Sequence, residues 1–162
     1  MSRTTISTPS LALTSQTREE VVRWLEQMST EDKRQMSPEW LALVESSPSD
    51  PWIHGFIMTL TSEAKPVGRC GFTGPPGSDG VVEIAYGVDP ECEGKGYATE
   101  AARGLVSFAL ADPRVRVVRA HTLPEENAST HVLTKCGFQR HGESIDREAG
   151  VVWKWERRKE EA

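Results

Sequence analysis

The sequence has no long apolar run and few cysteines, and each absence excludes a class of protein. No stretch approaches the roughly 20 apolar residues that span a bilayer, and the first residues lead into no apolar signal region. We therefore expect neither a membrane segment nor a secretory signal. The three cysteines form no CxxC pair, which argues against a disulfide scaffold and a zinc ribbon. These absences favour the reducing cytoplasm.

The chain also lacks a basic stripe. It carries 19 basic and 24 acidic residues, for a net charge of −5, which argues against nucleic acid as the main partner. Its 162 residues are 37% hydrophobic and 27% charged, and they show no internal repeat. This length and composition predict one globular domain over residues 1–162.

The spacing of apolar residues predicts a mixed α/β fold of about seven strands. A helix pair is expected at 17–47, where Thr17 and Glu20 match a capping box and Ser37-Pro38 matches a second helix start. The last residues, 157–162, are expected to form a charged, frayed tail. Strands are expected within 1–15 and at 52–61, 67–72, 81–88, 115–122, 138–145 and 151–156, with further helices at 94–110 and 127–136.

The loop after the strand at 81–88 carries the clearest functional signal. Gly94 and Gly96 lie where this loop enters a long helix, and the free amides of a helix start bind anions such as pyrophosphate. The loop is not a Walker A motif, because Asp89 stands where that motif needs glycine. It is not a dinucleotide fingerprint, because Thr99 stands at the third glycine. A plain tight turn is the alternative.

The segment Glu93-Gly94-Lys95-Gly96-Tyr97-Ala98 resembles the acyl-CoA-binding motif of the GNAT superfamily of N-acetyltransferases. A second block, from His121 through Asn127-Ala128-Ser129 to Gly137-Phe138, is similar to the branch that includes the ribosomal-protein N-terminal acetyltransferases. The two blocks cover residues 52–157. The resemblance implies a mixed, mostly antiparallel central sheet with helices on both faces, and acetyl-CoA as co-substrate.

The resemblance also implies which residues bind acetyl-CoA. Three positions depart from the family pattern. Glu93 replaces the usual glutamine or arginine, and Glu126 occupies the usual asparagine position. Leu133 stands where many members carry a tyrosine that acts as general acid. Any contact at Glu93 is therefore expected through the backbone. The implied cofactor-binding residues are Tyr86, Val88, Glu93, Gly94, Lys95, Gly96, Tyr97, Ala98, Thr99 and Asn127.

Acetyl transfer requires a base, because an amine acceptor is mostly protonated at neutral pH. Glu83 is the first candidate, since it is the only charge in an apolar strand and matches a glutamate frequent in the family. His121, at a strand end, is the rival base. Alternatively, Glu83 is a surface residue or pairs with an arginine such as Arg119. Direct attack of the amine on the thioester needs no metal, so none is expected.

The leaving thiolate takes its proton from solvent or from a side chain. Ser129 and Tyr86 are the candidate donors, although Ser129 is equally a first-turn helix residue and Tyr86 equally a core aromatic. A second class of function is a catalytically idle, CoA-binding regulatory module, which the three departures favour. A third, weaker reading is a cysteine hydrolase that uses Cys136 or Cys92 with a histidine.

The sequence does not identify the acceptor, which we expect to be a small-molecule or peptide amine. Its contacts are expected from the N-terminal helices, roughly Thr17–Val44, and from the Ser144–Val152 hairpin, since these parts vary within the resembled family. Acidic residues on the helices could attract a cationic amine or simply form a solvated face. A homodimer through the edge strands of the C-terminal hairpin is a further expectation.

Overall fold

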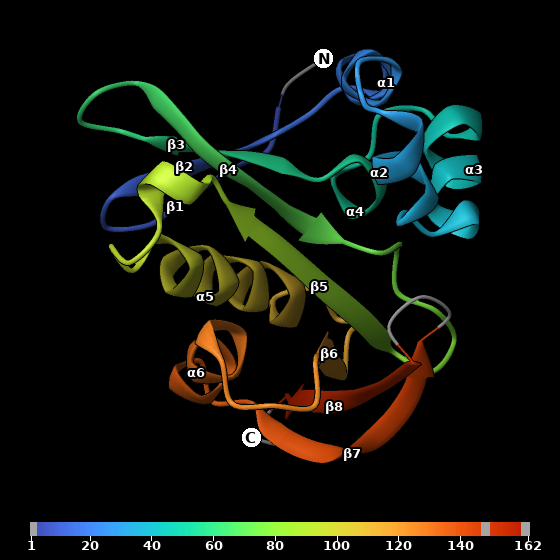
Figure 1. Ribbon diagram of the computed structural model, residues 1–162, viewed down its shortest axis with the longest axis vertical. Helices are drawn as coiled ribbons and strands as arrows, with labels where there is room; N and C mark the ends of the chain where they lie inside the picture. The colour runs from blue at the N-terminus through green and yellow to red at the C-terminus, as the bar shows by residue number, and fades with distance from the viewer. Residues whose placement is uncertain (1–2, 147–149, 160–162) are drawn as a thin grey trace.

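The computed structural model describes residues 3–146 and 150–159 (Figure 1). Within them, eight strands form one sheet in the order β1-β2-β3-β4-β5-β6-β8-β7. All neighbouring strands are antiparallel except β5 and β6, which confirms the mixed, mostly antiparallel sheet. The strands are β1 (Thr5–Ser7), β2 (Leu11–Ser15), β3 (Phe56–Leu60), β4 (Lys65–Phe72), β5 (Val81–Val88), β6 (Val117–Thr122), β7 (Gln139–Asp146) and β8 (Gly150–Arg158).

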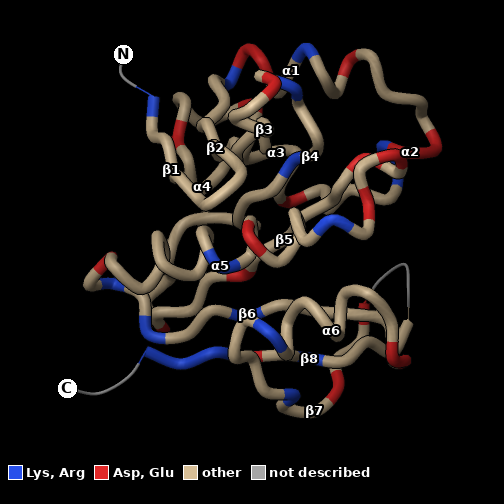
Figure 2. The backbone as a smooth tube through the Cα atoms, turned by 90° about the vertical axis from the view of Figure 1, so that its left-hand side faces the viewer, with Lys and Arg blue, Asp and Glu red and all other residues tan. Residues whose placement is uncertain are grey.

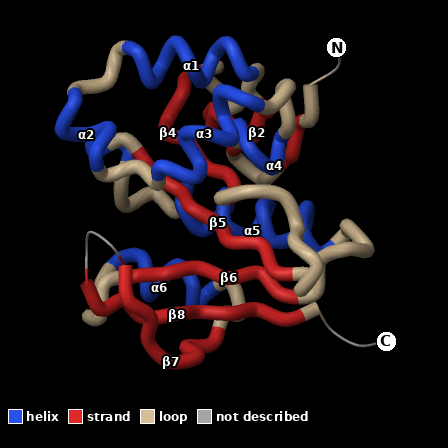
Figure 3. The backbone as a smooth tube through the Cα atoms, turned by 90° about the vertical axis from the view of Figure 1, so that its right-hand side faces the viewer, coloured by secondary structure: helices blue, strands red, loops and turns tan. Residues whose placement is uncertain are grey.

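The helices lie on both sides of this sheet (Figure 3). The α5 helix packs its alanine-rich stripe and Leu105 against the side chains of Val82 and Ile84 in the main core. A second apolar cluster holds the N-terminal helices together through Val21, Val44 and their neighbours. The helices are α1 (Arg18–Glu26), α2 (Thr30–Arg34), α3 (Pro38–Ser46), α4 (Pro51–His54), α5 (Tyr97–Leu110) and α6 (Ala128–Lys135), with a 3-10 turn η1 (Pro90–Cys92). None of the helices in the described ranges is long and apolar enough to cross a membrane.

Several predicted boundaries are wrong for local reasons. Residues 5–15 form two strands rather than one, because the Thr8 amide donates to the Leu11 carbonyl and closes a tight turn. Residues 51–54 are helical rather than extended, since Asp50 caps the Trp52 amide at 2.8 Å. The short α2 helix was not expected at all.

The C-terminal boundary also differs from the prediction. Arg157 and Arg158 belong to β8 rather than to a frayed tail, because they pair with Val118 and Val117 of β6. The rest of the predicted tail is described only at Lys159, whose amide donates to the Arg116 carbonyl. The predicted turn at 147–150 lies largely outside the described residues. The last two arginines therefore extend the sheet beside the strand that carries His121.

An ion pair between Arg119 and Glu156 joins β6 to β8. Arg119 donates to Glu156 Oε2 from Nε at 3.0 Å and from Nη2 at 2.7 Å, and Glu156 is buried. Burial acts to raise the pKa of Glu156, but the hydrogen bonds and charge of Arg119 outweigh it, so the pKa lies below its ordinary value of 4.5. The alternative in which Arg119 pairs with Glu83 is therefore wrong.

We predict that Glu156→Gln lowers the free energy of unfolding by about 1–3 kcal/mol, because Arg119 loses its charged acceptor. A carboxylate with a depressed pKa stabilises the fold above its unfolded-state pKa, and that contribution disappears as pH falls through the folded-state pKa. The wild type should therefore lose more stability than the variant below about pH 4.5. Urea unfolding at neutral pH and in acid measures both effects. Equal stability of the two proteins at neutral pH would contradict the prediction.

Candidate active site

The β5 and β6 strands separate at the centre of the sheet (Figure 1). They pair in parallel only where Val81–Glu83 lies beside Val117–Arg119. Beyond this point β5 runs on to Val88 with β4 as its only strand partner among the described residues, and β6 runs on with β8. The facing backbone edges can therefore hydrogen-bond an extended ligand rather than each other.

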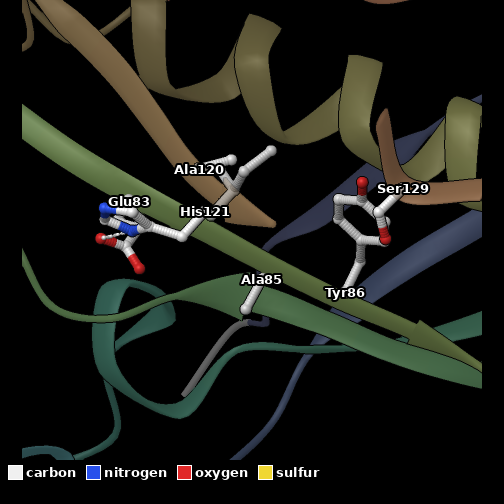
Figure 4. A pocket seen from close by; sticks show the side chains of 7 residues that line it. Glu83, Ala85, Tyr86, Ala120, His121 and Ser129 are labelled. Atoms are coloured by element: carbon white, nitrogen blue, oxygen red, sulfur yellow. Dashed lines mark ion pairs between the residues drawn. The ribbon is translucent and has the colours of Figure 1, made fainter. Parts of the chain in front are cut away.

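A cavity of about 190 Å³ lies where the two strands part (Figure 4). It brings together side chains that the sequence places on three separate elements. Glu83 and Tyr86 come from β5, His121 from β6 and Ser129 from the first turn of α6. Four residues singled out from the sequence thus line one cavity.

Glu83 and His121 form a pair on one face of the sheet. The parallel register sets Glu83 beside Arg119, and His121 follows two residues later on the same face. His121 Nδ1 lies 3.0 Å from Glu83 Oε1, and the two side chains are 26% and 32% exposed. The two rival bases are therefore close neighbours, each accessible to water or to a bound amine.

Tyr86 and Ser129 lie together in another part of the same cavity (Figure 4). Burial raises the pKa of Tyr86 to about 12, and a hydrogen bond with Ser129 acts in the opposite direction. The phenol therefore keeps its proton at neutral pH and can donate it. Leu133, at the position of the family's tyrosine, is fully buried and offers no acid.

The start of α5 is built to leave its amides free. Gly94 and Gly96 adopt φ of +79° and +85°, which ordinary side chains avoid. This geometry delays the helix to Tyr97 rather than the predicted Gly94. No side chain caps the helix, and a Cβ added at either glycine would meet nothing within 4 Å. The free amides and the open space suit an anion.

The remaining predicted cofactor residues lie in three places. Residues 93–99 gather at the start of α5, where the Glu93 side chain is exposed. Asn127 caps α6 instead, since its Oδ1 accepts from the Thr130 amide at 3.0 Å. Val88 ends β5 directly before the loop. The binding role of each of these residues stays a prediction.

The geometry disfavours the cysteine hydrolase. Cys92 and Cys136 are each only 3% exposed. Burial raises the pKa of the Cys136 thiol, and its Sγ lies 3.7 Å from the Thr99 carbonyl rather than beside a histidine. A buried, protonated thiol is a poor nucleophile.

The structure also has a larger cavity of about 890 Å³, which the sequence does not predict. Some of its lining residues come from the N-terminal helices, which are expected to contact the acceptor. It lies between those helices and the strands β4 and β5, and Ala85 and Tyr86 line both cavities. Arg69 of β4, which also lines it, was missed. The signal was present, since Arg69 interrupts the otherwise uncharged run from Val67 to Phe72.

Residues 7–139 match the family model described as an acetyltransferase (GNAT) domain, and the chain belongs to this family. The chain is 35% identical over 72 residues to YjdG, an uncharacterized N-acetyltransferase of Bacillus subtilis (strain 168), a match that covers 44% of this chain and 43% of YjdG. It is 30% identical over 87 residues to the uncharacterized N-acetyltransferase p20 of Bacillus licheniformis, which covers 54% of this chain and 49% of p20. The chain thus spans less than half the length of either relative.

Solved structures share the whole fold. A GNAT-family acetyltransferase from Bacillus anthracis has a TM-score of 0.71 at 20% identity, covering 98% of this chain and 100% of that one. RimL, a ribosomal L7/L12 alpha-N-protein acetyltransferase in complex with coenzyme A, has a TM-score of 0.71 at 16% identity, covering 96% and 98%. The aminoglycoside acetyltransferase AAC(6')-Ib, in complex with coenzyme A and kanamycin, has a TM-score of 0.66 at 19% identity, covering 92% and 95%. The expected fold and the resemblance to ribosomal-protein acetyltransferases are confirmed.

Proposed function

We propose that the protein transfers an acetyl group from acetyl-CoA to an amine. The observation that carries this proposal is the cleft where β5 and β6 part, which holds the Glu83–His121 pair. The uncapped start of α5 follows β5 in the chain. Family membership and the coenzyme A in RimL and AAC(6')-Ib support the proposal. The residues fit the cofactor because free amides and a glycine-lined opening suit a pyrophosphate, while the strand edge of β5 suits the amides of pantetheine.

In this mechanism acetyl-CoA supplies an activated acyl group, and the protein supplies position and proton transfer. Glu83 accepts the amine proton, directly or through one water, and His121, whose Nδ1 lies 3.0 Å from Glu83 Oε1, positions the carboxylate. Backbone amides near Val88 polarise the thioester carbonyl. Tyr86, with Ser129 beside it, donates a proton to the leaving thiolate.

The test is release of free thiol from acetyl-CoA over a panel of amines. The panel contains a peptide with a free N-terminus, a lysine derivative, a polyamine and an aminoglycoside. The proposal predicts amine-dependent release above the hydrolysis background. A catalytically idle module would bind acetyl-CoA in calorimetry but release no thiol with any amine.

We predict that His121→Gln lowers kcat about tenfold, because Glu83 loses the polar partner 3.0 Å from its carboxylate, and a polar contact to a charged group is worth about 1.4 kcal/mol or more. The affinity for acetyl-CoA should not change, since His121 is not among the residues expected to bind the cofactor. The control is His131→Gln, because His131 is exposed on α6. If His121→Gln abolishes turnover while Glu83→Gln does not, His121 is the base.

A further inference from the structure

The larger cavity adjoins the proposed reaction site, because Ala85 and Tyr86 line both, and we call it the helix-side groove. Its floor is the face of the sheet on which Arg69 lies opposite Gly87 and Gly71 opposite Ala85. Glu83 lies on this same face of β5, because side chains alternate along a strand. The groove therefore leads from the proposed base toward Arg69 along a floor of small residues.

Arg69 has an unusual position in this groove. Its guanidinium lies 4.3 Å from the centre of the Trp24 ring, which holds it by a cation–π contact. Its Nη1 is buried and has no hydrogen-bond partner. A buried donor without a partner is costly, so each such group needs an explanation.

The nearby carboxylates do not supply that partner. None of the ion pairs between described residues includes Arg69. Glu20 accepts instead from Arg3 and from the Thr17 amide, both at 2.8 Å. Burial lowers the pKa of Arg69, and the charges of Asp89 and Glu20 only oppose that shift.

The space over Gly87 is open. Gly87 lies directly across from Arg69 on β5, and a Cβ added to this glycine would meet nothing within 4 Å. A ligand can therefore approach the guanidinium over Gly87. Arginine presents a planar fork of donors, and its preferred ligand is a carboxylate.

The walls of the groove are mainly apolar. Trp24 and Trp40 line it with Met36 and Ile57, and the Trp40 ring is fixed by its 2.8 Å hydrogen bond to the Ile53 carbonyl. The helices above carry acidic and basic residues interspersed rather than an acidic patch (Figure 2). Arg69 and Asp89 are the charged residues of opposite sign among those that line the groove, whereas an apolar group would find matching walls.

We propose that Arg69 binds a carboxylate of the acceptor, which is an apolar amino acid or short peptide carrying both a free amine and a free carboxylate. The proposal rests on the proposed function only to place the amine near Glu83. The apolar side chain lies against Trp24 and Trp40, and the carboxylate pairs with the guanidinium of Arg69, which lines the groove. Arg69 thus selects the acceptor and takes no part in proton transfer.

The test measures product binding, which needs no turnover. Calorimetry in the presence of CoA compares N-acetyl-L-phenylalanine with its C-terminal amide, together with the N-acetyl derivatives of leucine, methionine and tryptophan and an N-acetyl dipeptide. In the wild type at least one carboxylate should bind about 10–100-fold more tightly than its amide. Arg69→Gln should remove this preference, and Arg69→Lys should keep part of it. The matched control is Arg23→Gln, because Arg23 is exposed on α1.

Comparing the N-acetyl amino acids with the N-acetyl dipeptide shows whether the carboxylate belongs to a free amino acid or to a short peptide. Equal binding of every acid and its amide by the wild type would overturn the proposal, as would an equal loss of both in Arg69→Gln. Thermal unfolding of the same samples measures what the lost contact with Trp24 costs in stability, so that ligand binding is compared only between folded proteins. A purely structural arginine would leave the acid-over-amide preference intact.

Failure of the proposed function would look different. If thiol release occurs with neither phenylalanine nor phenethylamine while the Arg69-dependent binding persists, acetyl transfer to such amines is wrong and carboxylate recognition is supported. If thiol is released with both amines equally, and equally by Arg69→Gln, transfer stands and the role of Arg69 is overturned.

Discussion

Replacing Glu83 by glutamine is expected to lower kcat about 10²–10⁴-fold, which is the usual contribution of a positioned general base. Glutamine keeps the shape and can still accept a hydrogen bond from His121, whose Nδ1 lies 3.0 Å from the carboxylate. It cannot accept the amine proton. Steady-state rates at saturating acetyl-CoA measure the effect, and the affinity for acetyl-CoA should hardly change.

The pH–rate profile sharpens this test. The fall in rate toward acid pH, which reports protonation of the base, should disappear in Glu83→Gln. Glu63→Gln, in an exposed turn between β3 and β4, is the control and should behave as wild type. A variant with near-wild-type kcat and an unchanged acidic limb would show that the proton leaves through His121 or an ordered water. Thermal unfolding of the same samples excludes loss of folding as the cause.

Substituting Gly96 by glutamate is expected to weaken acetyl-CoA binding about 100-fold or more. The new carboxylate would occupy the open space at the start of α5 and repel the phosphates, and repulsion between unit charges about 4 Å apart is worth several kcal/mol near a protein surface. Calorimetry with acetyl-CoA gives the dissociation constant.

Backbone strain accompanies this substitution, because Gly96 has a φ of +85°. Gly142→Glu is the matched control: Gly142 has a φ of +97° and open space around it, but it lies on β7. Both variants should lose similar stability, and only Gly96→Glu should lose acetyl-CoA affinity. Unchanged affinity in Gly96→Glu would move the pyrophosphate site away from the α5 start.

Some features followed from the sequence because their causes are local. The stripe of α5 follows from hydrophobic spacing and the β5 strand from its nearly continuous apolar run, and the Thr17–Glu20 capping box needs only residues three apart. The glycines before α5 predicted an uncapped helix start for the same reason. Boundaries failed where a short contact competed with the pattern, as when Asp50 capped α4 and prevented the expected strand from starting at Trp52.

The tertiary structure alone decided which distant residues meet. His121 and Glu83 are 38 residues apart in the printed sequence, and only the short parallel register of β5 and β6 brings them within 3.0 Å. The same register separates the strands after Glu83 and so creates the cleft. The sequence also could not show that Arg119 pairs with Glu156, or that Arg69 Nη1 has no hydrogen-bond partner. Both depend on which strands are neighbours in the sheet. Local spacing determines an element and its apolar face, whereas pairing across a sheet depends on how all the elements pack together.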